Sequence, residues 1–334
     1  MSIASPAPPH AEPVAEQKRR TTARLLPVDV AFRTAVRGSG LTLLVILGFI
    51  GLFLALRGFS ALDTAGHRFF TTQTWDPELH DFGIASVLPG TVEIALTALV
   101  VGVPIAVFAA LYISEYAAPG MRRALIALID LMAAIPSILY GLWGVTFLQP
   151  RLIGVSRWLS DHASFLPFFR VDTDHADPGS FTSSHFIAGL VVGMMVIPIC
   201  CSLSREVFSQ APQAEREAAY ALGSTRWGMI RTVVLPFGRG GVIGAAMLSL
   251  GRALGETIAV VLIISPDFRA TLHVLEGAGN SISALIALRY SDSSEFGLSA
   301  LMAAGLVLFA VTLVINFFAA MIINRSRSGA STEA

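Results

Sequence analysis

Residues 90–112 read GTVEIALTALVVGVPIAVFAALY, an apolar run that contains one acid, Glu93, and one proline, Pro104. A helix needs about 20 mostly apolar residues to cross the hydrocarbon core of a bilayer. Inside that core the backbone must satisfy its own hydrogen bonds, and a helix does so within a single segment. The stretch therefore predicts a membrane-spanning helix.

The same pattern occurs in five more places, at residues 40–56, 124–148, 186–207, 240–264 and 298–323. Of the 334 residues, 54% are hydrophobic and 14% are charged, and the mean hydropathy is +0.68. This balance excludes a soluble protein. Because the apolar runs lack the alternation of a membrane barrel, we expect an all-α polytopic membrane protein with about six transmembrane helices.

The polar segments define the predicted domains. Residues 1–38 are rich in proline, alanine and charge and predict a disordered cytoplasmic tail, and residues 324–334 predict a second, short one. Between them, residues 39–323 form the transmembrane domain, which includes a cytoplasmic loop at 209–239. The net charge is zero, so the chain gives no electrostatic reason to expect a nucleic acid partner.

The distribution of cationic residues predicts the orientation, because cytoplasmic loops of membrane proteins carry an excess of Lys and Arg. With a cytoplasmic N-terminus, that side collects Lys18, Arg19, Arg20, Arg24, Arg33, Arg37, Arg122, Arg123, Arg205, Arg216, Arg226, Arg231, Arg239, Arg325 and Arg327. The opposite side carries about half as many, interleaved with carboxylates. We therefore expect both termini in the cytoplasm.

The loop at 209–239 carries the most specific motif. Glu217-Ala-Ala is followed after three residues by Gly223, and the loop ends in Leu235-Pro236. The composition predicts one short helix that Gly223 stops or bends and a second that runs from Arg226 until Pro236 ends it. A helical connector on the membrane surface without a docking partner is the alternative.

This loop resembles the EAA loop of ABC importer permeases, in which the loop docks into a cleft on the ATPase. The resemblance implies that Ala218 and Ala219 allow close approach, that Glu217 can pair with cations and that Gly223 sets the elbow before Leu235 and Pro236. The chain contains no GxxxxGK[ST] phosphate loop. We therefore expect a transport subunit that is not an enzyme and that depends on a separate ATPase.

A charged pair, Arg252 and Glu256, lies inside the apolar run 240–264. A helix rises about 1.5 Å per residue, which places Arg252 roughly 18 Å into a core about 30 Å thick. On a continuous helix the two residues share one face and can pair. A buried guanidinium also suits an oxyanion, to which it offers two parallel donors. The alternative is a purely structural ion pair at a subunit contact.

The stretch from Gly251 to Val260, GRALGETIAV, resembles the phosphate-specific importer permeases of the PstC type. Trp75-Asp-Pro, Ala134-Ile-Pro-Ser, Asn280-Ser-Ile and the run from Leu308 to Asn316 agree with this. Ile258 departs from the family, where methionine is usual, and so does Glu93. The resemblance implies a MetI-like core of five helices plus an N-terminal helix in a bacterial inner membrane.

The resemblance also implies the partners: a PstA-type permease as heterodimer partner, a PstB-type ATPase dimer that carries the ATP and Mg, and an extracytoplasmic phosphate-binding protein. This chain itself is expected to bind no cofactor. By this resemblance, Arg252 and Glu256 are expected to be residues of the phosphate pathway. We leave open a permease for another oxyanion such as molybdate or sulfate, a proton-coupled secondary transporter or channel-like pore, and a membrane sensor of phosphate status.

Two further acids, Asp130 and Glu93, lie within predicted spans and are candidates for a secondary part of the pathway. Each can instead bond to a neighbouring helix. The histidines are scattered and lack metal-ligand spacing, so we predict no metal site.

Overall fold

The computed structural model describes residues 26–172, 177–268, 272–277 and 279–327. The chain divides into two units, residues 1–50 and 51–334, and the boundary falls within helix α1 (Pro27–Ala65). In the first unit the described residues are almost all helical, and their side chains are exposed. Helix α1 begins at Pro27, so the predicted tail at 1–38 is helical from that residue onward, and the rest of it lies outside the described residues.

Six helical segments of the described chain are long and apolar enough to cross a membrane, in agreement with the expected number. They are Pro27–Phe70, Val87–Tyr116, Ser137–Ala163, His185–Ser209, Arg226–Leu254 and Glu295–Met321. The first extends well beyond the predicted range at both ends, and the third and the fifth are displaced along the chain. The two displacements come from breaks in the backbone.

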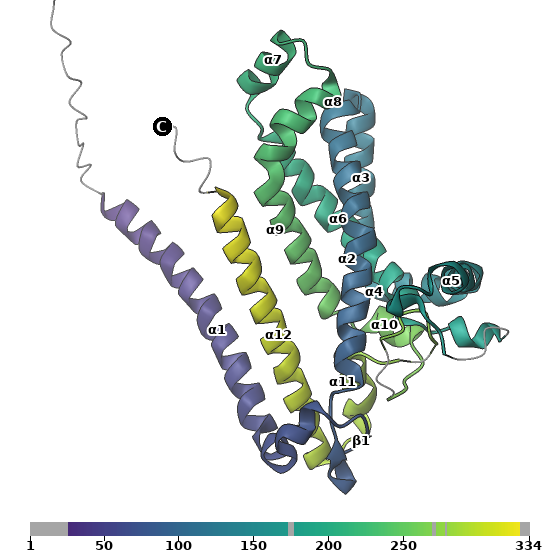
Figure 1. Ribbon diagram of the computed structural model, residues 1–334. Coiled ribbons are helices and arrows are strands. Elements are labelled where there is room, and N and C mark those ends of the chain that lie inside the picture. The colour runs from purple at the N-terminus through teal and green to yellow at the C-terminus, as the bar shows by residue number, and fades with distance from the viewer. Residues whose placement is uncertain (1–25, 173–176, 269–271, 278, 328–334) are drawn as a thin grey trace, which may run out of the picture. The chain divides into compact units, whose positions relative to one another are not determined.

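The third predicted span, 124–148, is divided by Pro136. Helix α3 (Pro119–Ala134) ends there, and α4 (Ser137–Trp143) begins directly after it. Ile135 adopts an extended conformation, with ψ of 128°, because proline disfavours the helical region for the residue before it. Helix α4 continues through the π turn η4 (Gly144–Leu148) into α5 (Gln149–Ala163). Helix α5 lies across the direction of the other long helices (Figure 1).

Helices α2 (Val87–Leu111) and α6 (His185–Ser209) form the centre of the second unit and pack closely along each other. Small residues make this approach possible: a Cβ added at Gly102 would lie 3.0 Å from the carbonyl oxygen of Gly193. Helix–helix contacts in membranes depend on such residues, because apolar burial alone gains little in lipid. Helix α9 (Leu235–Leu254) packs against α6, and α12 (Glu295–Arg327) packs against α9.

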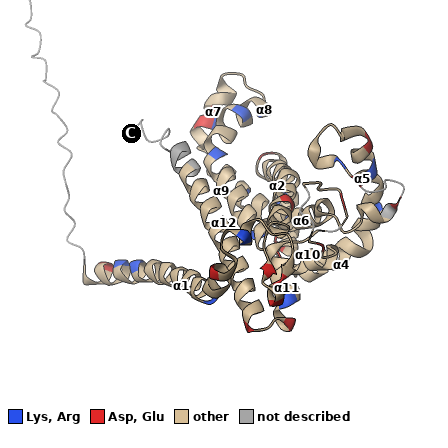
Figure 2. Cartoon of the chain, turned by 60° about the horizontal axis from the view of Figure 1, so that its bottom comes forward, with Lys and Arg blue, Asp and Glu red and all other residues tan. Residues whose placement is uncertain are grey.

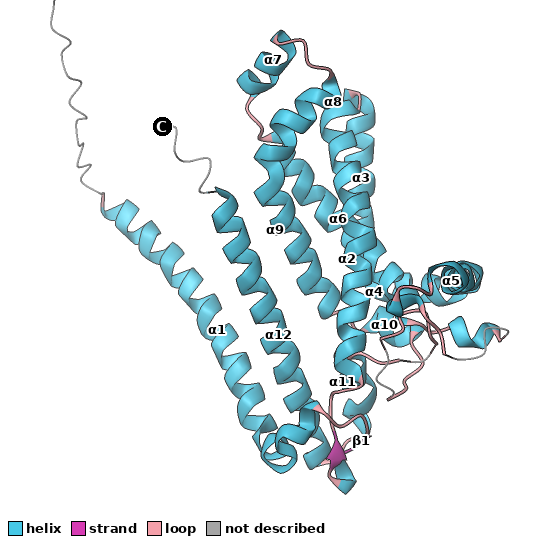
Figure 3. Cartoon of the chain, viewed as in Figure 1, coloured by secondary structure: helices cyan, strands magenta, loops and turns pink. Residues whose placement is uncertain are grey.

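Most of the remaining elements cap the two ends of the bundle (Figures 1 and 3). At one end, the π turn η3 (Tyr112–Tyr116) closes α2, and α7 (Gln213–Ala221), α8 (Arg226–Met229) and the π turn η7 (Ile230–Val234) lead into α9. The other end holds η1 (Gly66–Phe70), β1 (Trp75–Asp76), η2 (Pro77–Leu79), β2 (Asp81–Phe82), α11 (Ile282–Arg289) and η8 (Tyr290–Asp292). Helix α10 (Ile258–Ile263) packs against α4 and α6, and η5 (Pro167–Phe169) and η6 (Pro178–Phe181) pack against α5.

A small aromatic layer covers the second of these ends. Strands β1 and β2 pair antiparallel, with Trp75 opposite Phe82. Phe82 is buried and makes edge-to-face contacts with Phe69, Trp75 and Phe296. The layer joins the segment after α1 to the start of α12, which are distant in sequence.

Candidate functional site

The fifth predicted span is broken at the charged motif. Helix α9 ends at Leu254, and α10 begins at Ile258. Arg252 and Glu256 therefore do not share one continuous helix, and the expectation that they do is wrong. Gly255, which has the lowest helix propensity after proline, follows the last residue of α9. Within the described residues the two side chains form no ion pair.

Glu256 is buried, with 9% of its surface exposed, and it belongs to the start of α10. Its Oε1 accepts a hydrogen bond from the backbone N–H of Ala259 at 3.4 Å. Its backbone carbonyl accepts one from the hydroxyl of Ser283 at 2.7 Å. Glu256 thus supports the break, because it satisfies backbone groups that a continuous helix would have paired internally.

Arg252 has an exposed side chain and lines a groove of about 520 Å³ between three helices. The other residues of the groove are Ile199 of α6, Leu248 and Gly251 of α9, and Thr312 and Asn316 of α12. Among the residues that the structure describes, Arg252 has no carboxylate partner. An unpaired guanidinium in a membrane helix is costly unless water or an anion reaches it. Among the described residues, the groove therefore presents a guanidinium without a carboxylate partner.

Sequence reasoning assigned no role to Thr312 or Asn316, which the fold brings to Arg252. The hydroxyl of Thr312 donates to the carbonyl of Phe309 at 2.8 Å and keeps its lone pairs free. The Asn316 amide approaches Gly251, where an added Cβ would lie 3.8 Å from it. A neutral amide beside a guanidinium adds hydrogen-bond donors without adding charge. No spacing in the sequence links these positions to Arg252.

Glu93 and Asp130, the two acids predicted within spans, are not brought together. Glu93 is buried, and its Oε2 lies 2.7 Å from Nδ1 of His185, whose side chain is also buried. This is the bond to a neighbouring helix that the sequence left open. Asp130 is exposed on α3. A role for either acid in the ion pathway stays a prediction.

The motif loop at the opposite end of α9 has the predicted elbow. Helix α7 ends at Ala221, and Gly223 has a φ of +80°, a conformation that glycine adopts without strain. Thr225 then caps α8, its hydroxyl accepting from the N–H of Gly228 at 3.1 Å. Glu217 and Ala218 are exposed on α7, whereas Ala219 is buried against the rest of the loop.

The second helix of this loop does not end at Pro236, contrary to the prediction. Helix α8 continues through the π turn η7 into α9, and Leu235 and Pro236 are the first residues of α9. Proline lacks an N–H and is tolerated in the first turn of a helix. The wider π turn before Pro236 accommodates the backbone hydrogen bond that proline cannot donate. Helix α8 is therefore continuous with the helix that carries Arg252, and the non-helical residues Ser224 and Thr225 separate α8 from the Gly223 elbow.

Arg216 anchors α7 to the bundle. Its guanidinium pairs with Glu115 of η3 at 2.6 Å and also donates to the backbone carbonyls of Phe208 and Ala211 at 2.7 and 3.2 Å. The side chains of Arg216 and Glu115 are 14% and 4% exposed. The loop is thereby tied to the ends of α2 and α6, the two central helices. Figure 2 shows charged residues on α7 and α8, while the bundle helices are mostly uncharged.

A family model described as a binding-protein-dependent transport system inner membrane component matches residues 102–328. The chain belongs to this family. It is an inner-membrane permease, a transport subunit and not an enzyme, and its class of transport system works with a binding protein and an ATPase. The described part of the permease contains no cluster of His, Cys, Asp and Glu that could hold a metal ion.

Curated relatives of the permease carry a common name. The phosphate transport system permease protein PstC 2 of Mycobacterium tuberculosis is 38% identical over 289 residues, which cover 85% of this chain and 88% of that protein. The phosphate transport system permease protein PstC of Xylella fastidiosa is 36% identical over 298 residues, 89% and 91% of the two chains. That of Mesorhizobium japonicum is 32% identical over 328 residues, 95% and 97% of the two chains.

The fold of the permease also has a counterpart among solved structures. A bacterial ABC transporter involved in the import of the acidic polysaccharide alginate matches 88% of this chain and 99% of its own, with a TM-score of 0.54 and 20% identity. At this identity the likeness supports the all-α permease fold alone.

Proposed function

We propose that the chain is the PstC-type permease subunit of an ATP-driven phosphate importer, and that Arg252 holds phosphate in the groove between α6, α9 and α12. The observation that carries this is the unpaired guanidinium of Arg252 in that groove. A phosphate oxyanion accepts two parallel hydrogen bonds from a guanidinium, which compensates the cost of the charge within the membrane. The shared name of the curated relatives supports phosphate as the ion.

The open side of the groove is where a second permease fits. A PstA-type subunit would supply the opposite wall and turn the groove into a closed path. Glu256 does not touch the Arg252 guanidinium, and its role is to keep the α9–α10 break in place through Ala259 and Ser283. A single cation with weak neutral neighbours favours the modest affinity that a permeation step needs, because the ion must leave again.

The exposed face of α7 is the docking surface for a PstB-type ATPase dimer, which carries the ATP and Mg. Glu217 and Ala218 lie on that face. A push on α7 reaches α2 and α6 through the Arg216–Glu115 pair and reaches Arg252 through the continuous helical path from α8 to α9. In this arrangement both termini and the α7–α8 loop are cytoplasmic. The extracytoplasmic phosphate-binding protein approaches the other end.

The test is phosphate uptake by the complete importer in proteoliposomes, with the binding protein and ATP supplied. Arg252→Gln should reduce uptake at least about 100-fold, since the charge-assisted bonds to phosphate are worth roughly 1.5–3 kcal/mol each. Arg239→Gln, which removes an exposed arginine from the same helix outside the groove, should keep uptake near wild type. Normal uptake by Arg252→Gln would refute the proposal.

The same assay identifies the ion. Excess molybdate or sulfate should leave uptake of labelled phosphate unchanged, and competition by either would assign the permease to that oxyanion. Uptake that continues without ATP and depends on a proton gradient would instead indicate a secondary transporter. A sensor without transport would give no uptake while phosphate-dependent signalling persists.

A further inference from the structure

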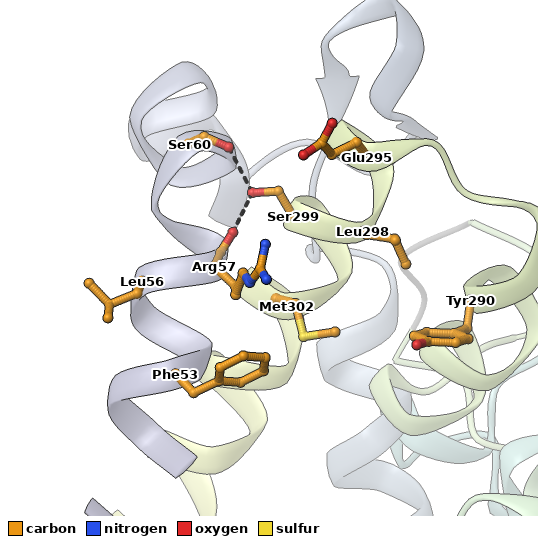
Figure 4. Close-up of a pocket in the computed structure, with 9 residues that line it drawn as sticks. All are labelled: Phe53, Leu56, Arg57, Ser60, Tyr290, Glu295, Leu298, Ser299 and Met302. Carbon is orange, nitrogen blue, oxygen red and sulfur yellow. Dashed lines mark hydrogen bonds between the residues drawn. The ribbon is translucent and has the colours of Figure 1, made fainter. Parts of the chain in front are cut away.

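A second pocket, of about 400 Å³, lies far from Arg252, where the last turns of α1 meet the first turns of α12 (Figure 4). Arg57 and Glu295 both line it. Its other residues are Phe53, Leu56 and Ser60 of α1, Tyr290 of η8, and Leu298, Ser299 and Met302 of α12. All of these belong to the second unit of the chain.

The walls of this pocket are held together by partly buried polar contacts. The hydroxyl of Ser299 donates to the carbonyl of Arg57 at 2.7 Å, and the hydroxyls of Ser60 and Ser299 lie 2.8 Å apart. At Gly58 an added Cβ would lie 2.8 Å from the backbone nitrogen of Ala303. The two helices therefore meet at backbone distance beside the pocket, which fixes its shape.

The pocket lies at the level of the lipid headgroups. Residues 38–56 of α1 contain no charge, and at about 1.5 Å per residue they span roughly 28 Å, close to the thickness of the hydrocarbon core. Arg57 is the first charged residue after that stretch. Glu295 stands at the corresponding end of α12, where the next charged residue is Arg325. Both charges thus lie where a phospholipid carries its polar group.

The two charges of the pocket do not neutralise each other. Arg57 and Glu295 make no ion pair within 4.0 Å, with each other or with another described residue. The Arg57 guanidinium lies 5.9 Å from the centre of the Phe53 ring, one turn toward the middle of the bilayer. Opposite charges that share a pocket without touching fit a ligand that itself carries both signs.

The polarity of the pocket changes along the membrane normal. Ser60 and Glu295 lie toward one end in Figure 4, and Phe53 lies toward the other, with the Arg57 guanidinium between them. Leu56 and Met302 are apolar as well, and the ring of Tyr290 lies toward the same end as Phe53, away from Ser60 and Glu295. This order matches a phospholipid, whose headgroup is polar and whose glycerol and acyl chains are apolar.

We propose that this pocket binds a zwitterionic phospholipid with a phosphoethanolamine headgroup, its phosphate on Arg57 and its primary ammonium on Glu295. Phosphatidylglycerol, whose headgroup beyond the phosphate is a neutral glycerol, would place no cation beside Glu295 and would leave the carboxylate charge uncompensated. The quaternary ammonium of phosphatidylcholine has no N–H to donate to the carboxylate. A primary ammonium both neutralises Glu295 and donates to it, which makes the bond charge-assisted.

The experiment measures the lipids that remain on the purified importer by native mass spectrometry, after titration with phosphatidylethanolamine, phosphatidylglycerol or phosphatidylcholine. The wild-type complex should retain phosphatidylethanolamine about tenfold better than either other lipid, the change expected for one charge-assisted bond. Arg57→Gln should lose this retention. Arg68→Gln, an exposed arginine of η1 outside the pocket, should keep it.

Glu295→Gln provides a second, independent test, because this variant leaves Arg57 in place. It should remove the preference for phosphatidylethanolamine over phosphatidylglycerol while some phospholipid stays bound. Equal retention of the two lipids by the wild type, or unchanged retention in Arg57→Gln, would overturn the proposal. Displacement of the lipid by millimolar inorganic phosphate would also overturn it, since the pocket would then take free phosphate. A partner subunit that covers the pocket and leaves no lipid bound would overturn the proposal as well.

Discussion

Arg252 and Asn316 show how much of the site depends on individual side chains. The guanidinium is the single cation among the described residues that line the groove, and the neutral amide of Asn316 lines the same space from another helix. A neutral neighbour leaves the positive potential at Arg252 intact. A negative one would occupy the guanidinium and exclude an incoming oxyanion.

Asn316→Asp should therefore reduce phosphate uptake, though less than loss of Arg252 does, with a fall of at least about tenfold. Phosphate uptake in proteoliposomes measures the effect. Phe317→Leu, at the exposed neighbouring position, serves as the control and should transport normally. Full activity of Asn316→Asp would place the amide outside the path of the ion.

The Glu93–His185 pair is a second contact that depends on single residues. Both side chains are buried, and Glu93 Oε1, His185 Nε2 and Asn280 Nδ2 have no hydrogen-bond partner within the described part of the chain. Gly90 and Gly279 leave room for the imidazole, since a Cβ at either position would collide with His185. The pair therefore ties α2 and α6 together at the end of the molecule opposite α7.

Removal of one partner of this pair should destabilise the permease more than removal of both. Glu93→Ala leaves the imidazole buried and unpaired, at a cost of about 3 kcal/mol. The double variant Glu93→Leu with His185→Leu should recover part of that loss. Thermal unfolding of the detergent-purified importer provides the measurement, and equal midpoints for the single variant and the wild type would contradict the role of the pair.

At the scale of elements, two features govern how motion can pass through the molecule. One is the break between α9 and α10, which Gly255, Glu256 and Ser283 support. The other is the attachment of α7 by the Arg216–Glu115 pair. The path from α8 through η7 to α9 has no break, so we expect a displacement of α8 to reach the helix that carries Arg252.

Arg216→Glu should release α7 from η3 and uncouple transport from ATP hydrolysis, because like charges would then face each other in a nearly dry contact. We expect phosphate uptake to fall at least about tenfold while the ATPases still bind nucleotide. Exchange of both charges, with Glu115→Arg and Arg216→Glu, should restore part of the uptake. Failure of the exchange together with normal folding would mean that the pair only stabilises the loop.

Gly223→Val tests the elbow itself. A β-branched residue at a φ of +80° is strained by at least about 1–2 kcal/mol, so the turn between α7 and α8 should distort. Copurification of the ATPase with the permease should then fall, whereas Gly228→Ala within α8 should leave it unchanged. Retained ATPase association and normal transport in Gly223→Val would favour a transporter that needs no docking loop.

At the scale of the whole molecule, the exposed apolar surface indicates that the permease does not work alone. Large hydrophobic side chains are exposed along α1, α2, α3 and α12, and the Arg252 groove is open on one side. Lipid covers part of this surface, and a second permease covers the groove in the proposed heterodimer.

Gentle detergent extraction should therefore yield this chain together with a second, homologous permease and an ATPase, detected by mass spectrometry. A variant without the described residues of α1 before Gly51 serves as the matched control, because the Arg252 groove belongs to the second unit of the chain. Recovery of the chain alone, in a form that transports, would contradict the assembly.

The sequence by itself determined the number of spans, the all-α class and the family, because hydrophobicity over about 20 residues and the Glu217 and Gly251 motifs are local properties of the chain. The left-handed Gly223 is local as well. Only the tertiary structure decided where the helices break and which side chains meet. Pro136 could equally have kinked its helix, and Pro236 could have ended one. The partner of Glu93, the place of Asn316 beside Arg252 and the anchor from Arg216 to Glu115 join segments far apart in the chain, and such contacts follow from packing rather than from spacing.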